Sequence, residues 1–541
     1  MSIDSEWWKR AVFYQIYPRS FFDSNGDGIG DLKGIEAKLD YVAGLGVDAI
    51  WLSPVFTSPM KDFGYDVSDY RGIDPIFGTL GDFDDLIAAV HARGLKLIVD
   101  QVWSHTSDQH PWFIESAASR DNPKADWYVW ADAKPDGTAP NNWMAVFGGP
   151  SWRWSPRRRQ YYLHNFLIEQ PDLNFWTPAV QEAILDVARF WLDRGVDGFR
   201  LDVINFLFHD RELTDNPAIG LTRPPTEATD YQRHLYDRSR PETLAFLAKV
   251  RALLDSFGDR MTVGEVVDAT LLQRQIEYTT PPDRLHTAYG FFFLRAREAT
   301  PELFAAAMTA WADAPGWPSW SLSNHDVVRF PSRLAHSAGP AQVKGLLALL
   351  LSLRGSPFLY QGDELGLPHA EVPFERLKDP FAIALYTGES GRDGARTPMP
   401  WTAAGPNAGF STAGQTWLPI DPRHLPLAVA AQEAQPESML HFTRRMLAAR
   451  KRSPALQSGG VHILKSPDGV LAFERRTGDE CVLCAFELAG QSARFDDDGL
   501  DGARMLGGDG GAALVGRAVT LPPYAFAWMR RASAGQPGAS A

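Results

Sequence analysis

The 541-residue chain has only two cysteines, Cys481 and Cys484, and both lie in one short apolar run. A Cys-x-x-Cys pair can serve redox chemistry or bind zinc, but a zinc site needs further ligands and none lie nearby in the sequence. Residues three apart on a strand point to opposite faces, so these two thiols do not easily meet. We therefore expect buried, structural cysteines.

Long hydrophobic runs and basic tracts are also missing. No stretch of about 18 apolar residues could span a bilayer, and the first six residues lack the basic start and apolar run of a secretory signal. Lys and Arg number 53 against 66 Asp and Glu, a net charge of −13, and no basic tract stands out beyond Arg157–Arg159. We therefore expect a cytoplasmic protein with neither nucleic acid nor membranes as partners.

The chain does have enough apolar residues, 45%, to bury a large core. From about residue 11 to residue 450, short β-branched or aromatic runs alternate with amphipathic helical patterns. The predicted strands are Val12–Tyr17, Ala49–Pro54, Lys96–Val102, Gly198–Val203, Met261–Val266, Thr287–Phe293, Trp320–Asn324 and Pro357–Tyr360. The predicted helices between them are Leu32–Leu45, Phe83–Arg93, Pro178–Arg194, Glu242–Phe257, Gln342–Leu353 and Pro436–Lys451. This alternation predicts an α/β fold, a (β/α)8 TIM barrel, with a doubly wound open sheet as the alternative.

Three connections are too long for ordinary loops. Residues 104–172, rich in Trp, Pro, Gly and Arg, predict a subdomain inserted after the third strand, and further excursions cover residues 206–240 and 362–423. All three leave from strand C-terminal ends, where barrel enzymes build their active sites.

A change of pattern after residue 454 predicts a second domain. The expected strands there are Val461–Lys465, Val470–Arg475, Glu480–Glu487 and Ala518–Met529. We therefore expect a barrel formed by residues 1–103 and 173–454, the inserted subdomain 104–172, and a C-terminal antiparallel β-domain, 455–541.

Ionisable residues cluster where the fourth and fifth predicted strands end. Arg200 and Asp202 share one strand face, and a guanidinium beside a carboxylate favours the ionised form that a nucleophile needs; a structural ion pair is the alternative. Glu265 lies among apolar residues, where burial would raise its pKa and suit a general acid, although it could instead cap the next helix.

Two further clusters end the third and seventh strands. Asp100 and His105 lie in the first of these, and His325 and Asp326 in the second. Each has an ordinary explanation alone, but a barrel brings the C-terminal ends of its strands around one pocket. We therefore predict an active site there.

These residues resemble the motifs of the α-amylase superfamily of glycoside hydrolases, specifically its α-glucosidase and oligo-1,6-glucosidase branch. The resemblance covers nearly the whole chain and rests on motifs in the family's order: Asp100–His105, Gln170–Asn174 (a signature typical of that branch), Gly198–Asp202, Gly264-Glu265 and Asn324–Asp326.

Each motif residue takes its expected role from this resemblance. It implies that Asp202 is the nucleophile of a retaining reaction, that Glu265 is the acid/base, and that Asp326 holds sugar hydroxyls and supports the transition state. Arg200 would orient Asp202, while His105 and His325 would bind the transferred glucosyl ring.

Two segments resemble those that make such an enzyme exo-acting. In Asp62–Asp66, Asp62 would bind the terminal glucose and Tyr65 would stack on it. The loop Gly391–Met399 would supply an arginine that pairs with Asp62, and we favour Arg392 over Arg396. Phe166 is expected to pack against the same sugar, and loop scaffolding is the alternative for each element.

The segment Asp23–Asp31 has the pattern of a cation loop. Side-chain oxygens at its first, third, fifth and ninth positions and a backbone carbonyl at the seventh suit a hard cation; the residues are Asp23, Asn25, Asp27, Asp31 and Ile29. Gly34 stands where an EF-hand has its glutamate. The segment resembles the structural calcium or magnesium loop of this branch, with a metal-free loop of Asx turns as the alternative.

We therefore expect an exo-acting, retaining α-glucosidase on short α-1,4- or α-1,6-linked oligosaccharides or glucosides, of the maltose, isomaltose or sucrose type. Val203, directly after the nucleophile, resembles the α-1,6-acting members, but linkage preference stays open. Ser104 replaces the family's usual asparagine, which argues against an endo-amylase calcium site.

Several rival functions are possible on the same fold. A transglucosylase would pass glucose to a sugar or alcohol, and a sucrose-acting hydrolase would differ mainly beyond the transferred glucose. Sucrose isomerisation is disfavoured because Val327–Arg333 lacks the charged run of those enzymes. A non-catalytic transporter-subunit ectodomain would lack the carboxylate set and carry a membrane anchor.

Overall fold

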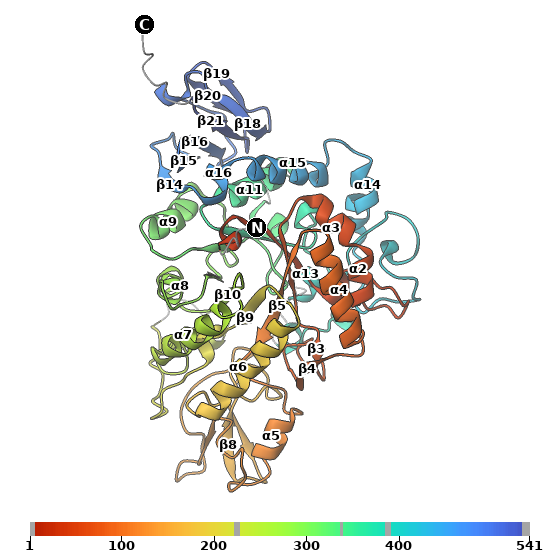
Figure 1. The fold of residues 1–541 in the computed structure, drawn as a ribbon, viewed down its shortest axis with the longest axis vertical. Coiled ribbons are helices and arrows are strands. Elements are labelled where there is room, and N and C mark those ends of the chain that lie inside the picture. The colour runs from red at the N-terminus through yellow and green to blue at the C-terminus, as the bar shows by residue number, and fades with distance from the viewer. Residues whose placement is uncertain (1–5, 221–227, 336–338, 385–390, 533–541) are drawn as a thin grey trace.

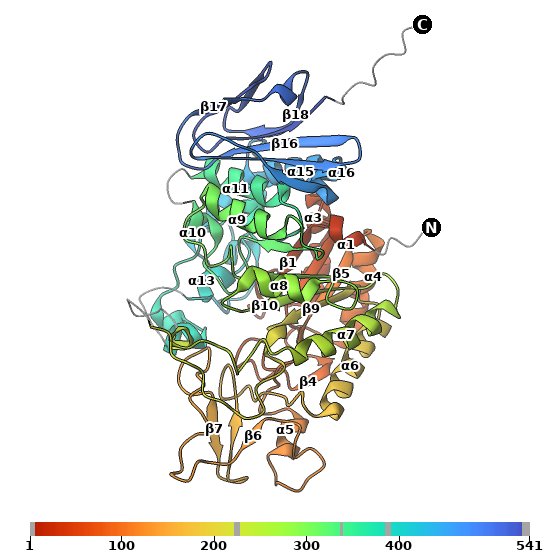
Figure 2. The same cartoon turned by 90° about the vertical axis from the view of Figure 1, so that its left-hand side faces the viewer.

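A computed structural model describes residues 6–220, 228–335, 339–384 and 391–532 of the chain. Figure 1 labels its helices and strands, and Figure 2 shows the same fold from the side. A large α/β body lies in the middle, with a small β-rich lobe at one end and an antiparallel β-domain at the other.

The central body is the predicted barrel. Eight parallel strands pair in the order β11-β10-β9-β5-β2-β1-β13-β12, and a parallel bridge between Ala288 and Pro318 joins the two ends of that sheet. The strands are β1 (Phe13–Ile16), β2 (Ala49–Leu52), β5 (Lys96–Val102), β9 (Gly198–Asp202), β10 (Met261–Val266), β11 (Thr287–Gly290), β12 (Ser319–Ser321) and β13 (Ser356–Tyr360). This closure excludes the open, doubly wound alternative.

Helices surround the barrel. The longer ones are α2 (Leu32–Ala37), α3 (Leu39–Leu45), α4 (Leu80–Ala92), α6 (Pro178–Asp193), α7 (Glu242–Asp255), α8 (Leu271–Thr279), α9 (Pro301–Trp311), α11 (Pro340–Ser352) and α15 (Met439–Lys451). The shorter ones are α1 (Trp7–Arg10), α10 (Phe330–Leu334), α12 (Pro380–Ala384), α13 (Asp393–Arg396), α14 (Val429–Glu433) and α16 (Pro454–Ser458), while α5 (Pro111–Ser116) lies in the inserted segment. None of the described helices is both long and apolar enough to cross a bilayer.

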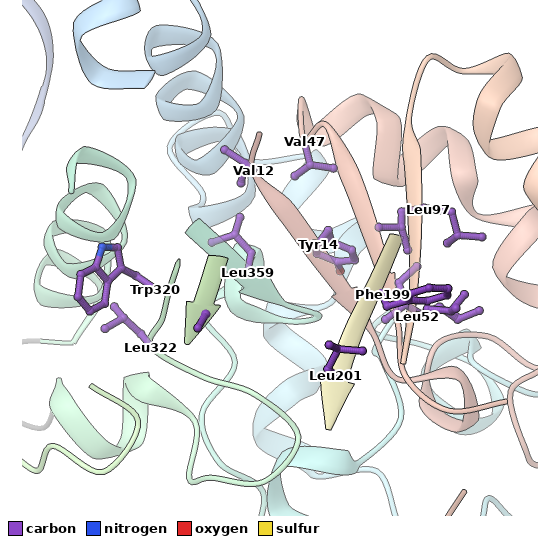
Figure 3. Close-up of a cluster of buried hydrophobic side chains, with 14 of the residues drawn as sticks. Val12, Tyr14, Val47, Leu52, Leu97, Phe199, Leu201, Trp320, Leu322 and Leu359 are labelled. Atoms are coloured by element: carbon purple, nitrogen blue, oxygen red, sulfur yellow. The ribbon is translucent and has the colours of Figure 1, made fainter. Parts of the chain in front are cut away.

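Successive side chains along each barrel strand point alternately outward and inward, which separates two hydrophobic cores. Side chains such as Phe199, Leu201 and Leu52 point outward and pack under the helices (Figure 3). The inward-facing set fills the lower barrel, where the rings of Phe13 and Phe358 stack with centroids 4.4 Å apart. The charged side chains of Arg200, Asp202 and Glu265 lie beyond this filled part, toward the C-terminal ends of their strands.

The inserted segment after β5 forms the small lobe. It contains α5 and a three-stranded sheet, and an antiparallel bridge between His105 and Asp172 joins its two ends. The strands are β6 (Trp130–Ala131), β7 (Trp152–Ser155) and β8 (Gln160–Leu163). A two-stranded ribbon, β3 (Phe56–Thr57) and β4 (Asp69–Ile73), precedes it.

The C-terminal β-domain has one sheet of five strands and one of three. The first has the order β14 (Gly460–Ile463), β15 (Val470–Thr477), β16 (Glu480–Glu487), β21 (Phe526–Arg530), β18 (Arg504–Asp509), and the second β17 (Ala493–Asp496), β20 (Ala518–Leu521), β19 (Ala513–Val515). Both cysteines are free. Cys484 is fully buried as predicted, but Cys481 is only partly buried, so the expectation of two buried cysteines is wrong for Cys481.

Two predicted elements are divided in the structure. The helix expected over Leu32–Leu45 is broken at Lys38, which has a non-helical backbone and places its ammonium over the rings of Phe22 and Trp401, 4.2 and 4.5 Å from their centroids. The strand expected over Ala518–Met529 is broken after Leu521, because two prolines follow and proline has no N–H for the ladder.

Candidate active site

Arg200 forms the centre of the polar layer above the filled barrel. Its fully buried guanidinium lies 2.9 Å from Asp100 Oδ1 and 2.6 Å from Asp202 Oδ1 through Nη1, and 2.7 Å from Glu265 Oε1 through Nη2. The register that pairs β9 with β5 and β10 brings these carboxylates together from three strands. Three carboxylates in one desolvated site share a single guanidinium.

Burial disfavours the ionised forms of the two predicted catalytic carboxyls. It raises the pKa of Asp202 and of Glu265 to about 7 each, against the opposing effect of Arg200. Glu265 also accepts a hydrogen bond from the backbone N–H of Val203 at 3.1 Å. A carboxyl with a pKa near neutrality can both give and take a proton, as an acid/base must.

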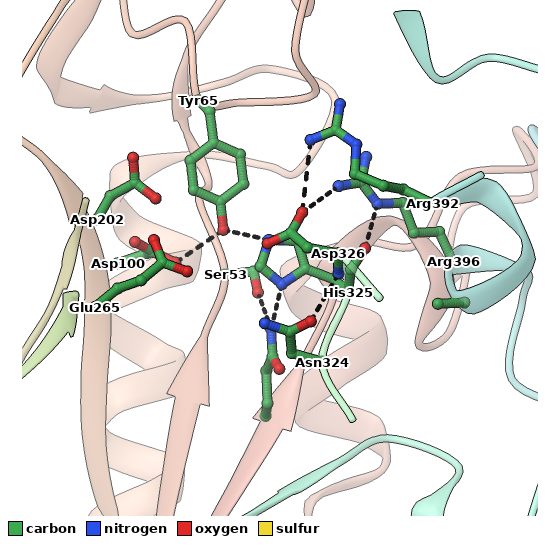
Figure 4. Close-up of polar contacts among 12 residues, drawn as sticks. Ser53, Tyr65, Asp100, Asp202, Glu265, Asn324, His325, Asp326, Arg392 and Arg396 are labelled. Carbon is green, nitrogen blue, oxygen red and sulfur yellow. Dashed lines mark hydrogen bonds and ion pairs between the residues drawn. The ribbon is translucent and has the colours of Figure 1, made fainter. Parts of the chain in front are cut away.

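Asp326 has the opposite electrostatic environment. Burial alone would raise its pKa, but His325 and the guanidinium groups of Arg396 and Arg392 together hold it below its usual range. Arg396 Nη2 lies 2.8 Å and Arg392 Nη1 3.5 Å from Asp326 Oδ1 (Figure 4). Asp326 is therefore a fixed negative charge beside the two protonatable carboxyls.

A second arginine–aspartate cluster closes one side of the site. Arg392 Nη2 lies 2.8 Å from Asp62 Oδ1, as predicted for Arg392 in preference to Arg396. The same guanidinium contacts Asp379 at 2.7 Å, and Asp379 also accepts from the Arg392 backbone N–H. The ring of Phe147 packs against the guanidinium, 5.0 Å away.

A cavity lies between these two clusters. One part of its wall is polar and contains Asp62, Tyr65, His105, Gln170, Asp202, Glu265, Asp326 and Arg392. The rest is largely apolar and includes Val146, Phe147, Phe166, Val203, Phe206, Val267, Phe291, Val327 and Phe381. Phe166 stands beside His105, with ring centroids 5.1 Å apart.

The structure brings together all the predicted catalytic and substrate-binding residues, but two of them do not line the cavity. Arg200 is fully buried beneath the carboxylates. His325 is also fully buried: its Nε2 lies 2.6 Å from the Tyr65 hydroxyl, and its ring stacks on that of Tyr65. His325 Nε2 also lies 3.2 Å from Oδ2 of Asp326, which does line the cavity, and the sugar contact of His325 stays a prediction.

The predicted cation loop is a separate feature. Asp23, Asn25 and Asp27 each accept hydrogen bonds from backbone N–H groups two to five residues ahead, and Asp31 caps α2. These contacts are Asx turns. No group of three or more His, Cys, Asp or Glu side chains placed to hold a metal occurs in the described part of the chain, although the loop's oxygen atoms are of the type that hard cations prefer.

Two buried residues that contact the site, Tyr289 and Asp379, are not among those predicted from the sequence. Asp379 lies in a long segment without a recognisable motif, and Tyr289 lies within a predicted apolar strand. Their roles come from contacts with residues far along the chain, so neither had a local signal.

A closed (β/α)8 barrel with carboxylates gathered at the C-terminal ends of its strands is an architecture that glycoside hydrolases share with other classes of barrel enzyme. The family model described as alpha amylase, catalytic domain, matches residues 15–459, and that of the maltogenic amylase C-terminal domain matches residues 461–528. The chain belongs to the α-amylase family.

Relatives refine this assignment. A probable alpha-glucosidase of Rhizobium meliloti (strain 1021) is 54% identical over 501 residues, 91% of each chain. An oligo-1,6-glucosidase of Heyndrickxia coagulans is 37% identical and covers 93% of this chain and 96% of its own. The crystal structure of the alpha-glucosyl transfer enzyme XgtA superposes with a TM-score of 0.92 at 48% identity, covering 97% of this chain and 100% of that one.

Proposed function

We propose that this protein is an exo-acting, retaining α-glucosidase that releases glucose from the non-reducing end of short α-linked oligosaccharides. The observation that carries the proposal is the Asp62–Arg392 pair, 2.8 Å apart, at one side of a cavity that also holds Asp202, Glu265 and Asp326. The names of the two enzyme relatives, an α-glucosidase and an oligo-1,6-glucosidase, support it.

The reaction proceeds in two steps in this proposal. Asp202 attacks the anomeric carbon while Glu265 protonates the departing glycosidic oxygen, so one C–O bond forms as another breaks. Glu265, now ionised, removes a proton from water, which attacks the glucosyl-enzyme and restores Asp202. Arg200 orients the nucleophile, and the fixed charge of Asp326 holds hydroxyls of the ring as oxocarbenium character develops.

The pocket shape supports action at chain ends. Asp62 and Arg392 neutralise each other yet keep hydrogen-bonding capacity for the hydroxyls of a terminal glucose, and Phe147 covers the guanidinium. A further sugar beyond that glucose would have to displace this buried ion pair, which is costly.

Transfer to acceptors other than water is the second candidate. The similarity to an α-glucosyl transfer enzyme supports this candidate. The apolar side chains of the cavity wall also support it, because they limit access of water to the intermediate. This second candidate also covers sucrose-type substrates, and both candidates cover α-1,4 and α-1,6 linkages.

The deciding experiment compares initial rates of glucose release from maltose, isomaltose and soluble starch. We expect turnover of at least one disaccharide and little turnover of starch, with Asp202→Ala and Glu265→Gln reduced by about 10³-fold or more. Near-wild-type activity of either variant on an unactivated disaccharide would contradict the site assignment. If the amount of free glucose released is well below the amount of substrate consumed, transfer to other acceptors is favoured.

Two supporting predictions complete the proposal. We propose a structural calcium or magnesium ion, without a catalytic role, in the loop Asp23–Asp31, on the basis of its oxygen donors. We also propose a cytoplasmic location, with which the unpaired thiols of Cys481 and Cys484 agree.

A further inference from the structure

Tyr289 on β11 lies between the guanidinium of Arg200 and the carboxylate of Glu265. Its hydroxyl accepts hydrogen bonds from Arg200 Nη2 at 2.8 Å and Nε at 3.1 Å, and donates to Glu265 Oε1 at 3.0 Å. Parallel pairing sets Tyr289 opposite Glu265 in the ladder. The hydroxyl therefore connects the shared guanidinium to the predicted acid/base.

The tyrosine ring is fixed and does not face the substrate. It is 3% exposed, packs in the barrel core with Trp51 and Phe358, 6.0 and 6.4 Å away, and is absent from the cavity wall. Burial raises the pKa of Tyr289 well above its ordinary value, so the phenol keeps its proton and remains a donor.

Glu265 has donors on both oxygens. Oε1 receives the Tyr289 hydroxyl and Arg200, and Oε2 receives the backbone N–H of Val203. Val203 makes that contact from a left-handed conformation, with φ 33° and ψ 48°. Such a conformation is strained for a β-branched residue and persists only where the surroundings enforce it.

The hydrogen bonds from these donors oppose the effect of burial on the pKa of Glu265. A buried carboxyl resists ionisation, whereas hydrogen bonds to the carboxylate favour it. Glu265 has to be protonated before the first step and ionised before the second, so the two effects have to balance near the working pH.

We propose that Tyr289 is a positioning residue for proton transfer: its hydroxyl holds the Glu265 carboxylate and anchors the guanidinium that also contacts Asp202. The inference rests on the proposed function, because it takes Glu265 as the acid/base. Tyr289 acts through these two side chains and touches no atom of the sugar.

The test is Tyr289→Phe, which removes the hydroxyl and keeps the ring. The basic limb of kcat/KM for maltose or isomaltose, whichever the enzyme cleaves faster, reports ionisation of Glu265 in the free enzyme. Loss of a donor to the carboxylate raises the pKa of Glu265, so this limb moves to higher pH, by about one unit. The kcat falls while KM changes little.

Tyr360→Phe is the matched control. Tyr360 is another fully buried barrel tyrosine, on β13, and its hydroxyl donates to the Ala395 carbonyl oxygen at 3.0 Å, away from the carboxylates. Tyr360→Phe should leave the basic limb of the kcat/KM profile at its wild-type pH. Thermal melting of both variants separates a loss of folding from a change in proton transfer.

Each outcome of this test either supports or contradicts the inference. If Tyr289→Phe loses activity equally at every pH with an unmoved basic limb, the hydroxyl is merely structural and the inference is wrong. If the wild type releases no glucose from either disaccharide, the proposed function is wrong, and this result differs from the one that contradicts the inference about Tyr289. If Tyr289→Phe does not fold, 3-fluorotyrosine at position 289 replaces it: its more acidic phenol is a stronger donor, so the basic limb should move to lower pH, and an unmoved limb overturns the inference.

Discussion

The buried side chain of Asp379 orders Arg392, a residue of the cavity wall, without lining the cavity itself. Its carboxylate accepts from the backbone N–H of Arg392 at 3.0 Å and from Nε and Nη2 at 3.0 and 2.7 Å. Burial alone would raise the pKa of Asp379, but Arg392 lowers it below its usual value, so the carboxyl is ionised. A long guanidinium side chain is thereby ordered before any substrate arrives.

We expect Asp379→Asn to loosen Arg392 and weaken binding of the terminal glucose. Because the Asp62–Arg392 contact exists before and during the reaction, its loss should raise KM by about 10-fold and lower kcat much less. Steady-state kinetics on the better disaccharide measure both constants.

Asp421→Asn is the control for this change. Asp421 is also buried and pairs with an arginine, Arg423, but that pair lies outside the cavity. Equal KM values for Asp379→Asn and wild type would show that Arg392 keeps its place without Asp379.

Individual site residues were predictable where their neighbours in sequence formed a motif. Asp202 follows Arg200 by two positions on one strand face, and Asp326 follows His325 directly, so local spacing carried the signal. Tyr289 and Asp379 act on residues about 24 and 13 positions away, through contacts that only the closed barrel and the folded loop create. The resemblance favoured Arg392 over Arg396 as the partner of Asp62, and the structure adds that Arg396 instead contacts Asp326.

At the scale of elements, the barrel was predictable because its strands are short, apolar and separated by helical patterns. All five residues of β9 are buried, with Phe199 and Leu201 under the helices and Arg200 and Asp202 inside. The missed boundaries lie at Lys38, which has a non-helical backbone, and after Leu521, where two prolines follow. Both are local departures that hydrophobic periodicity does not encode.

The loop Asp23–Asp31 lies against a segment that is far away in the sequence. It packs close to the segment around Ser411, whose hydroxyl donates to Asp23, and the backbone of Gly28 approaches Gln415 so closely that a side chain would clash. A cation there would tie the first barrel loop to this neighbouring segment.

We expect calcium, or magnesium, to raise the melting temperature of chelator-treated protein by about 2–4 °C, because an ion that binds only the folded state stabilises it. Differential scanning calorimetry in EDTA and then in each ion measures this. Asp27→Ala should abolish the response, and Asp136→Ala, in an exposed Asx turn of the inserted lobe, should retain it. Identical melting in EDTA and in both ions would favour the metal-free Asx-turn loop.

At the scale of the whole molecule, the C-terminal domain shares its core with the barrel. Phe473, Phe486 and Trp528 belong to the same apolar cluster as the barrel helices, and the rings of Phe442 on α15 and Phe526 on β21 meet at 5.9 Å. The change of sequence pattern at residue 454 predicted the second domain but not this joint core, because contacts between domains leave no periodicity. We therefore expect the two domains to unfold together.

Arg475 provides the sharpest test of that coupling. This fully buried arginine on β15 donates to the carbonyl oxygen of Ser352, at the end of α11, at 2.6 Å, and to that of Gly459 at 2.8 Å. Arg475→Ala leaves those carbonyls without their partner and opens a cavity, so the free energy of unfolding should fall by about 3 kcal/mol. Arg476→Ala, at the exposed neighbour that pairs with Glu474, should change the free energy of unfolding by less than about 1 kcal/mol.

Denaturant unfolding followed by far-UV circular dichroism and by tryptophan fluorescence should show one coincident transition for the wild type and for both variants. Two separate transitions in Arg475→Ala, with the barrel at its wild-type midpoint, would mean that the shared apolar core does not couple the domains.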